Sequence, residues 1–486
     1  MSSYFTDLAQ QYIDGEWRPG TGSWDIIDFN PYDGEKLASI TIATVDEVDQ
    51  AYRAAARAQK EWAATTGYAR RAVFEKALRL VEEREPEITD VIIAELGGTR
   101  LKAAFELHLA KEFLRESIHL ALRPEGKILP SPVDGKENRV YRVPVGVVGV
   151  ISPFNFPFLL SLKSVAPALA LGNGVVLKPH QNTPVSGGSL VAKIFEDAGL
   201  PGGLLNVVIT DIAEIGDAFI EHPVPEVISF TGSDKVGRHV ATVCASHLKR
   251  SVLELGGNSA VVVLDDADLD YAVDAAVFSR YVHQGQVCMA ANRIMVDRSV
   301  AEEFTAKFVA KVRSLKVGDP RDPETVIGPL INSTQANAVS GAVEQAIAEG
   351  ATALLRGTTT DNLVEPSVLT DLPADSSLLR QEVFGPVAFV IPFDGEEEAV
   401  RIVNDTPYGL SGAVHTADVE RGVAFAKQID TGMFHVNDGT VHDEPLVPFG
   451  GEKHSGVGRL NGETTPDAFT TLKWISVQHG RSGFPF

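Results

Sequence analysis

Residues 175–209 read VVLKPHQNTPVSGGSLVAKIFEDAGLPGGLLNVVI. Two short apolar runs, at 175–178 and 205–209, flank a stretch with helical spacing at 184–198. Strands that alternate with helices of about 10–15 residues are typical of βαβ units. The strands of a parallel sheet are buried on both faces, so they are apolar runs rather than alternating patterns. The stretch therefore predicts an α/β fold with a mainly parallel sheet.

The same alternation extends outward in both directions. Further apolar runs lie at 146–151, 227–230, 252–255, 260–264 and 294–296, with helical stretches at 234–246 and 269–282. The pattern resumes after a Gly/Pro-rich region around 318–329 and continues to about residue 432, and 46–63 and 68–96 are predicted to be helical. At roughly 150 residues per domain, the 486 residues predict two to four domains.

Two segments fit neither pattern. Residues 123–144 contain prolines and the pair Asp134-Gly135 between extended pieces, which indicates a hairpin. Residues 470–477 have the composition of a strand. Because exposed strands need a partner surface to cover their edges, we expect an arm that contacts another subunit.

Charge and cysteine content restrict the class of protein. The chain has 43 Lys and Arg against 65 Asp and Glu, and the net charge of −22 repels phosphate backbones and anionic lipid. No apolar run approaches the ~20 residues that span a bilayer, and the N-terminus lacks the features of a secretory signal. We therefore expect no nucleic-acid or membrane partner. Two cysteines exclude a disulfide framework and predict a cytoplasmic protein.

Each of the two cysteines has a different sequence context. Cys288 lies in HQGQVC after an apolar helical stretch, where it is either a small buried hydrophobic residue or a nucleophile. Cys244 lies at helical spacing among Val240, Val243 and Leu248, which predicts a core position.

Glu254 and Asn155 both lie at the ends of apolar strands. Glu254, in LELGGN, is costly to bury unless it is hydrogen-bonded or functional, and burial raises the pKa of a carboxyl toward that of a general base. The alternative is a glutamate at a strand end that reaches solvent. Asn155, in PFNFP, is held by aromatics and prolines, as an oxyanion donor must be, although asparagine is also ordinary in such turns.

The segment FTGSDKVG places Gly232 and Gly237 at a strand-to-helix junction, where backbone amides can hold a pyrophosphate. Lys178 ends the run 175–178 and either reaches a ribose hydroxyl or phosphate or is solvated. The 12 histidines show no HExxH-like spacing, so we expect no metal site.

Taken in order, the motifs PFNFP, LKP, FTGS, LELGGN, GQVC and QEVFGPV resemble those of the aldehyde dehydrogenase superfamily. The match is co-linear from about residue 12 to residue 476. The spacings of 23 residues from Asn155 to Lys178, 76 to Glu254 and 34 to Cys288 are similar to that family's. The form PFNFP resembles the bacterial benzaldehyde/vanillin dehydrogenase branch.

The resemblance implies two Rossmann-like parallel-sheet domains and a small β oligomerisation arm. The NAD(P)-binding domain would comprise 1–122 and 142–255, and the catalytic domain 256–435. The arm, 123–141 and 470–486, would cross to another subunit of a homodimer or homotetramer. Residues 436–469 would return to the cofactor domain and the substrate tunnel.

The resemblance also implies roles for these residues. The Cys288 thiolate would attack the aldehyde, Asn155 would hold the oxyanion with the Cys288 backbone N–H, and Glu254 would activate the water that hydrolyses the thioester. Cofactor contacts are implied for Ile151, Phe154, Lys178, Gln181, Gly232, Ser233, Gly237, Glu382 and Phe384.

The implied substrate tunnel is apolar and suits a neutral aromatic aldehyde such as benzaldehyde or vanillin. Its predicted lining is Leu159, Leu160, Val282, Val287, Met289 and Phe449. The tunnel segments contain no arginine to clamp a substrate carboxylate, but Lys163 and His442 could do so. An aliphatic aldehyde or semialdehyde is therefore the alternative substrate.

Two other functions are disfavoured. A CoA-acylating dehydrogenase does not need the base Glu254, and a non-catalytic protein would have lost Cys288, Glu254 or Asn155. Many NAD-preferring relatives carry a glutamate where this chain has Gln181, and that carboxylate would repel the 2′-phosphate of NADP. The neutral amide predicts that NAD and NADP are both used.

Overall fold

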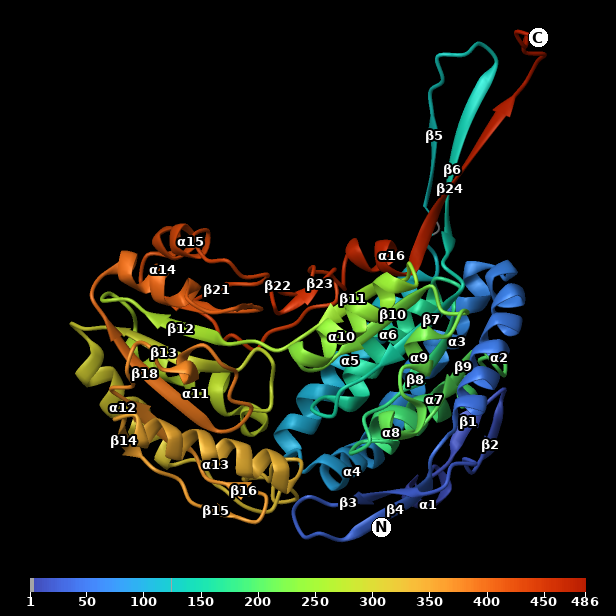
Figure 1. Cartoon of the computed structure of the whole chain (residues 1–486). Helices are drawn as coiled ribbons and strands as arrows, with labels where there is room; N and C mark the ends of the chain where they lie inside the picture. Colours follow the sequence, from blue (N-terminus) through green and yellow to red (C-terminus); the bar gives the residue numbers. More distant parts are fainter. Residues whose placement is uncertain (1–3, 124) are drawn as a thin grey trace.

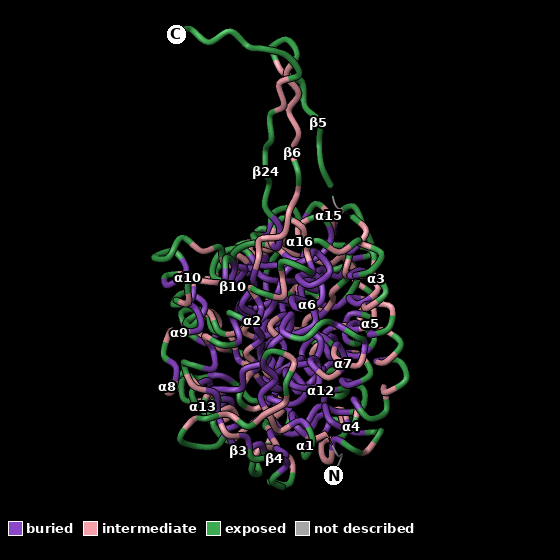
Figure 2. The backbone as a smooth tube through the Cα atoms, turned by 90° about the vertical axis from the view of Figure 1, so that its right-hand side faces the viewer, coloured by how far each residue is buried: buried purple, intermediate pink, exposed green. Residues whose placement is uncertain are grey.

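The computed structural model describes residues 4–123 and 125–486, so residues 1–3 and 124 of the predicted domains lie outside it. Within the described residues, two sheets lie side by side, each with helices on its faces, and a thin arm projects from the first (Figure 1). Buried residues fill the interior of the body, whereas the projecting arm is intermediate or exposed along nearly its whole length (Figure 2).

The first sheet has eight strands, and those at its centre are parallel. In spatial order its strands are β2 (Glu16–Arg18), β1 (Gln11–Ile13), β9 (Leu205–Val207), β8 (Gly174–Lys178), β7 (Val147–Ile151), β10 (Val227–Thr231), β11 (Arg250–Glu254) and β23 (Gly456–Val457). Antiparallel strands close both edges, and the sequence had not predicted β1, β2 or β23.

The second sheet has seven strands, all parallel to their neighbours except β14 at one edge. In order they are β14 (Thr352–Leu355), β17 (Ser367–Thr370), β18 (Val387–Phe393), β13 (Ala291–Asp297), β12 (Ser259–Val263), β20 (Ala413–His415) and β21 (His435–Val436). The prediction of a mainly parallel α/β architecture is confirmed. β11 and β12 follow each other in the chain but belong to different sheets. The chain passes from one sheet to the other between residues 254 and 259, a segment that contains the predicted domain boundary at 255/256.

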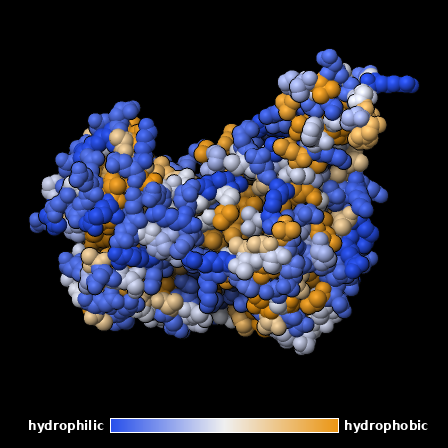
Figure 3. Space-filling model, turned by 45° about the horizontal axis from the view of Figure 1, so that its top comes forward, coloured by the Kyte–Doolittle hydropathy of each residue, from blue (hydrophilic) through white to orange (hydrophobic). Residues whose placement is uncertain are grey.

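The arm is a three-stranded antiparallel sheet of β24 (Thr470–Gln478), β6 (Lys136–Pro144) and β5 (Gly126–Leu129). Its two segments are far apart in the sequence, yet β24 and β6 pair from Thr470 with Pro144 to Gln478 with Lys136. Figure 3 shows hydrophobic side chains on this arm. The exposed ones include Ile128, Leu472 and Trp474, the last 68% exposed.

Helices cover both sheets, and the predicted helical region 68–96 is divided into α3 and α4. They are α1 (Tyr4–Asp7), α2 (Val45–Ala64), α3 (Gly67–Glu83), α4 (Glu85–Leu96), α5 (Arg100–Leu120), α6 (Pro157–Ala170), α7 (Leu190–Ala198), α8 (Ile212–Ile215), α9 (Ala218–Glu221), α10 (Asp234–Ser246), α11 (Leu269–Tyr281), α12 (Ala301–Arg313), α13 (Ser333–Ala348), α14 (Glu396–Asn404), α15 (Val419–Ala426) and α16 (Thr464–Phe469). Three shorter two-stranded pieces are β3 (Asp25–Phe29) with β4 (Lys36–Thr41), β15 (Thr359–Thr360) with β16 (Leu363–Val364), and β19 (Tyr408–Gly409) with β22 (Glu452–Lys453).

Two helical regions bear on the site. The helix expected at 184–198 begins as a π-helical turn, Val185–Ser189, before α7. Helix α6 is buried along nearly its whole length, because it is packed between the first sheet and α5. No helix in the described part of the chain is long and apolar enough to cross a bilayer.

Candidate active site

Strands of the first sheet end together at one edge. In register, Ile151 at the end of β7 pairs with Lys178 of β8 and Phe230 of β10, and Thr231 pairs with Glu254 of β11. The chain runs outward from β7 through β8 to β9 and then returns to the other side of β7 as β10. Such a switch point, at the carboxyl ends of parallel strands, forms a ligand crevice. The strand order therefore places Lys178 and Glu254 beside a binding crevice.

A cavity of about 550 Å³ lies along this edge, within the range of small-molecule sites. Most of the residues predicted to contact a cofactor line it: Ile151, Phe154, Lys178, Gln181, Gly232, Ser233, Glu382 and Phe384. The last two come from the loop 381–386 of the second sheet, so the cavity joins the two halves of the molecule.

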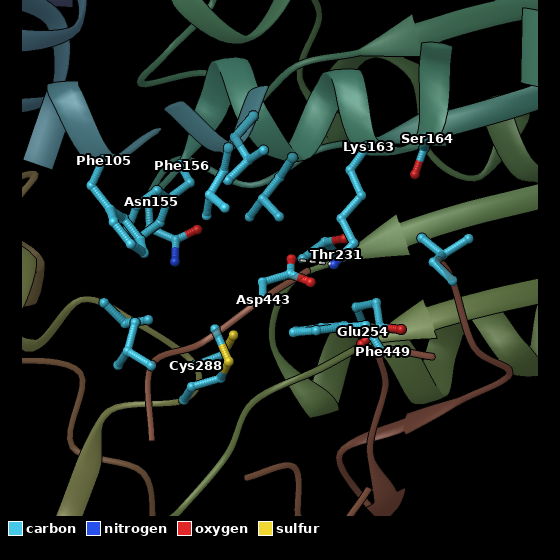
Figure 4. Close-up of a pocket in the computed structure, with 17 residues that line it drawn as sticks. Phe105, Asn155, Phe156, Lys163, Ser164, Thr231, Glu254, Cys288, Asp443 and Phe449 are labelled. Carbon is cyan, nitrogen blue, oxygen red and sulfur yellow. Dashed lines mark hydrogen bonds and ion pairs between the residues drawn. The ribbon is translucent and has the colours of Figure 1, made fainter. Parts of the chain in front are cut away.

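A second, smaller cavity of about 40 Å³, shown in Figure 4, shares part of its wall with the first. The residues that line both cavities are Asn155, Leu160, Thr231, Glu254 and Cys288. The wall of the smaller cavity is mainly apolar and includes Phe105, Leu109, Phe156, Leu159, Val287, Met289, Val441, Phe449 and Leu460. The thiol, the carboxyl and the amide that the sequence singled out therefore meet where the large cavity adjoins the small, mainly apolar one.

The loop that carries Cys288 has an unusual backbone. Residues 283–285 have positive φ angles of 51°, 55° and 74° in succession. Left-handed conformations cost a non-glycine residue about 1–2 kcal/mol, so they persist only where the surroundings fix them. Here Gln284 Nε2 donates to the Pro329 carbonyl oxygen at 2.9 Å. Tertiary contacts thus hold the loop in a form that local sequence alone would not adopt.

Burial dominates the electrostatics of the two candidate catalytic groups. It raises the pKa of Glu254 to about 8 and that of the Cys288 thiol to about 12, and the charges of Glu382 and Glu254 add to the second shift. Neither carboxyl oxygen of Glu254 has a hydrogen-bond partner in the described residues. An unpaired buried carboxyl is costly, and a pKa near the working pH suits a general base.

Asn155 lies between the end of β7 and the start of α6. Its Nδ2 donates to the Gln286 carbonyl oxygen at 3.0 Å, which ties it to the loop of Cys288. An amide nitrogen has two N–H donors, so one remains for an oxygen in the cavity. In Figure 4, Asn155 and Cys288 converge on the same space. The geometry matches a preorganised oxyanion donor.

A buried ion pair forms part of the smaller cavity's wall. Lys163 Nζ lies 2.6 Å from Asp443 Oδ2, with side chains 3% and 6% exposed, and 3.4 Å from the centre of the Phe449 ring. Asn461 Nδ2 donates to the other carboxylate oxygen of Asp443 at 2.8 Å. The ammonium is thus neutralised by a carboxylate that is itself held in place.

With this geometry established, comparison with known proteins gives the family. The sequence model of the aldehyde dehydrogenase family matches residues 17–475. The chain belongs to the aldehyde dehydrogenase family. The predicted resemblance to this family, and to its benzaldehyde/vanillin branch, is confirmed.

Individual relatives cover nearly the whole chain. A benzaldehyde dehydrogenase of Bacillus subtilis (strain 168) is 58% identical over 482 residues, which are 99% of each protein. A vanillin dehydrogenase of Corynebacterium glutamicum is 46% identical over 97% of this chain and 98% of its own. The solved structure of a salicylaldehyde dehydrogenase from Pseudomonas putida G7, complexed with salicylaldehyde, has a TM-score of 0.95 at 34% identity and covers 98% of this chain and 99% of its own.

Some predicted contacts of this aldehyde dehydrogenase need correction. Val282 does not line the smaller cavity: it is packed in the core, 6% exposed, because the left-handed turn after it redirects the chain. Gly237 lies outside the wall of the larger cavity, and an added Cβ would collide with Leu255, so its small size serves the packing of α10 on β11. Ser233 lines the cavity, but its hydroxyl caps α10 by accepting from Val236 N at 3.4 Å.

Other lining residues of this aldehyde dehydrogenase were missed from the sequence. Phe105 and Leu109 of α5 line the smaller cavity, although they lie far from every motif. Their only signal is a spacing of four residues on a helix, which is ordinary for a core position. The larger cavity is also lined by residues around α8 and α9, including Asp211, Ile212 and Phe219.

The larger cavity fits a dinucleotide. An added Cβ at Gly256 would lie 2.5 Å from Glu382 Oε2, so the space beside Glu382 depends on glycine. Burial lowers the pKa of Lys178, and the charge of Asp211 partly restores it. Asp211 Oδ1 also accepts from Ala213 N at 2.7 Å and caps α8. The wall thus offers a cation, Lys178, a carboxylate, Asp211, and the partly exposed carboxyl group of Glu382.

Proposed function

We propose that this aldehyde dehydrogenase oxidises neutral aromatic aldehydes to carboxylic acids with a nicotinamide dinucleotide. The observation that carries the proposal is the junction of the two cavities, where Cys288, Glu254 and Asn155 face the same space. The 58% identity to a benzaldehyde dehydrogenase supports the aromatic substrate.

In the proposed reaction, the Cys288 thiol loses its proton to solvent, and the thiolate Sγ attacks the carbonyl carbon of an aldehyde in the smaller cavity. The free N–H of Asn155 and the backbone N–H of Cys288 stabilise the oxyanion, each donor contributing about 2.7–4 kcal/mol. Lys178, Gly232, Ser233 and Glu382 would hold a dinucleotide, which would take up the hydride that leaves the carbonyl carbon. The acyl group is left as a thioester on Cys288.

Glu254 completes the proposed cycle. Its carboxylate takes a proton from a water molecule as that water attacks the thioester, and the acid and the free thiol are released. A CoA-acylating enzyme would need no such base. The presence of a buried, unpaired carboxyl beside the thiol therefore favours hydrolysis.

The charges around the smaller cavity support a neutral substrate. The sequence left open that Lys163 or His442 clamps a substrate carboxylate. Lys163 is neutralised by Asp443, and His442 contacts Glu444 outside the cavity wall. A substrate carboxylate would thus meet Glu254 and Asp443 with no free cation in the described part of the wall.

A panel of aldehydes tests the substrate class. We expect kcat/KM for benzaldehyde to exceed that for succinate semialdehyde by about tenfold or more, because a substrate carboxylate would lose its hydration in an apolar wall whose lysine, Lys163, is already paired with Asp443. Initial rates of NADH formation give both values. Asp443→Asn should free Lys163 and shift the ratio toward succinate semialdehyde, whereas Glu444→Gln, outside the wall, should not. A tenfold preference of the wild type for succinate semialdehyde would overturn the proposal.

For the cofactor, we propose that NAD is used and that NADP is used less well. By resemblance, Lys178 and Gln181 approach the adenosine ribose. Gln181 bears no charge to repel a 2′-phosphate, but Asp211 lies in the same wall and acts electrostatically on Lys178. Two relatives that are benzaldehyde dehydrogenases are described as NAD-dependent, which supports a preference for NAD over NADP.

Two substitutions separate these effects. Gln181→Glu should lower kcat/KM for NADP and spare NAD, because it adds a second carboxylate near the phosphate. Asp211→Asn should raise kcat/KM for NADP by about tenfold, since it removes the repulsion and asparagine can still cap α8. Steady-state rates with each cofactor, and cofactor affinities, provide the measurement. Equal effects on both cofactors would contradict the assignment of these residues to the ribose end.

We also propose the domain roles implied by the sequence. The first sheet and its helices would bind the cofactor, the second would carry the thiol, and the arm would pair with another copy in a homodimer or homotetramer. The exposed Ile128, Leu472 and Trp474 support a covered arm, since a free monomer would leave them in water. Both cysteines are free thiols, which suits the reducing cytoplasm that we propose as the compartment.

A further inference from the structure

Arg280, at the end of α11, is a fully buried cation that the proposed reaction does not use. Its hydrogen-bond acceptors in the described residues are all neutral oxygens. Burying a guanidinium without a hydrogen-bonded carboxylate is costly: burial lowers the pKa of Arg280 to about 10, and the charges of Tyr281 and Glu382 offset this shift only in part. A residue that is kept at such a cost needs a structural or functional explanation.

The guanidinium bridges the two loops that meet at the active site. Its Nη2 donates to the Val383 carbonyl oxygen at 2.9 Å and to that of Gly385, on either side of Phe384. The same nitrogen donates to the Gly285 carbonyl oxygen at 3.3 Å, in the loop that leads to Cys288. The first loop carries Glu382 and Phe384, and the second carries the thiol.

The second terminal nitrogen of the guanidinium anchors this bridge to a strand. Arg280 Nη1 donates to Asn292 Oδ1, on the strand β13 that follows the cysteine loop. The two loops are also in direct contact, because an added Cβ at Gly285 would collide with both the Arg280 guanidinium and the Gly385 carbonyl oxygen. Gly285 itself has a positive φ and belongs to the left-handed run 283–285.

We propose that Arg280 is a positioning residue, which fixes the loop 381–386 to the loop 283–288 so that Glu382, Phe384 and Cys288 keep one geometry. The inference rests on the proposed function, in which Glu382 helps to hold the cofactor, Phe384 lines the same cavity and Cys288 attacks the aldehyde. A loop that shifts by a fraction of an ångström would misplace the cofactor relative to the thiol.

Only arginine has the donors for this bridge. Its planar group presents N–H bonds in fixed directions and reaches several carbonyl oxygens at once, whereas lysine presents one compact ammonium. Arg280→Lys therefore keeps the charge and much of the bulk but loses the simultaneous contacts to the two loops and to Asn292. Comparison of the two side chains isolates the bridging geometry.

A matched control exists in the first half of the molecule. Arg70 is also buried, and it donates to the carbonyl oxygens of Ala170 at 3.0 Å and Thr65 at 2.9 Å, far in the sequence from either active-site loop. Arg70→Lys should lower the melting temperature without any effect on the site. This variant therefore measures how far the melting temperature falls when a buried arginine away from the two active-site loops is replaced by lysine.

The experiment uses the full-length protein with Cys244→Ala, so that Cys288 is the sole thiol. We measure the Kd of NAD+ by calorimetry without aldehyde, and the rate of Cys288 alkylation by iodoacetamide, below the melting temperature of each variant. For Arg280→Lys we expect the Kd to rise about tenfold and the alkylation rate to change about tenfold, with kcat/KM falling accordingly. For Arg70→Lys both should stay within about twofold of the parent.

If Arg280→Lys lowers only the melting temperature, as Arg70→Lys does, the proposal is wrong and Arg280 is merely structural. Should Arg280→Lys fail to fold, Asn292→Ala is the second test, because it removes the acceptor of Arg280 Nη1. An unchanged Kd and alkylation rate in that variant would also overturn the proposal. Absence of aldehyde oxidation in a wild type that binds NAD+ would count against the proposed function alone, because neither readout needs turnover.

Discussion

Replacement of Cys288 by alanine is expected to lower kcat for benzaldehyde oxidation by about 10⁴-fold or more, because the covalent intermediate cannot form. The thiol lies where the two cavities meet, whereas Cys244, a residue of α10, is 1% exposed in the core and burial raises its pKa to about 11. No second thiol can therefore take over the reaction. Steady-state formation of NADH measures the loss.

The control for this variant is Cys244→Ala, which should retain most of the activity. Calorimetry should find that Cys288→Ala binds NAD+ about as well as the wild type does. The substitution removes one sulfur atom from a cavity wall that is built from about 30 residues. Turnover of Cys288→Ala at the wild-type rate would refute the role of the thiol.

Glu254→Gln is expected to lower kcat by about 10²–10⁴-fold, the usual contribution of a general base. The amide has nearly the same shape but cannot take a proton from water, so the thioester should persist. Rapid mixing should show a burst of NADH followed by slow turnover, and mass spectrometry should find the acyl group on Cys288. A steady-state rate equal to that of the wild type would exclude the proposed role.

The pH dependence provides a second test of Glu254. Burial raises the pKa of this carboxyl to about 8, and the base must be ionised to act. The wild-type rate should therefore rise as the pH increases through about 8 and should be low where the carboxyl is protonated. The Gln variant should lose this dependence in the deacylation step. A wild-type deacylation rate that is already flat well below that value would contradict the assignment.

The fold could largely be predicted from the sequence because its signals are local. An apolar run buried on both faces, followed by a helix of regular spacing, specifies a βαβ unit within about thirty to forty residues. The strands β7, β8, β10, β11, β12 and β13 all lie at predicted runs. The antiparallel edge strands β1, β2 and β23 were missed, because they are two or three residues long and are defined by their partners.

The candidate site was predictable in part for the same reason. Asn155, Lys178 and Glu254 follow or end apolar strands, so their places at one sheet edge follow from the strand pattern. Val282 was assigned to the tunnel because it is apolar and near Cys288 in the chain. The left-handed run 283–285 turns the chain between them, and that turn is held by contacts with residues far away.

The sequence by itself determined the α/β fold and the family, and it singled out Cys288, Glu254 and Asn155 as candidates, because these inferences depend on periodicity and on short motifs. Only the tertiary structure decided what surrounds them. Lys163 and Asp443 are 280 residues apart, yet they form the ion pair that leaves the substrate cavity without a free cation among its described lining residues. Arg280 likewise reaches carbonyl oxygens more than 100 residues away. Such contacts arise from the packing of whole layers, and no local pattern in the chain specifies them.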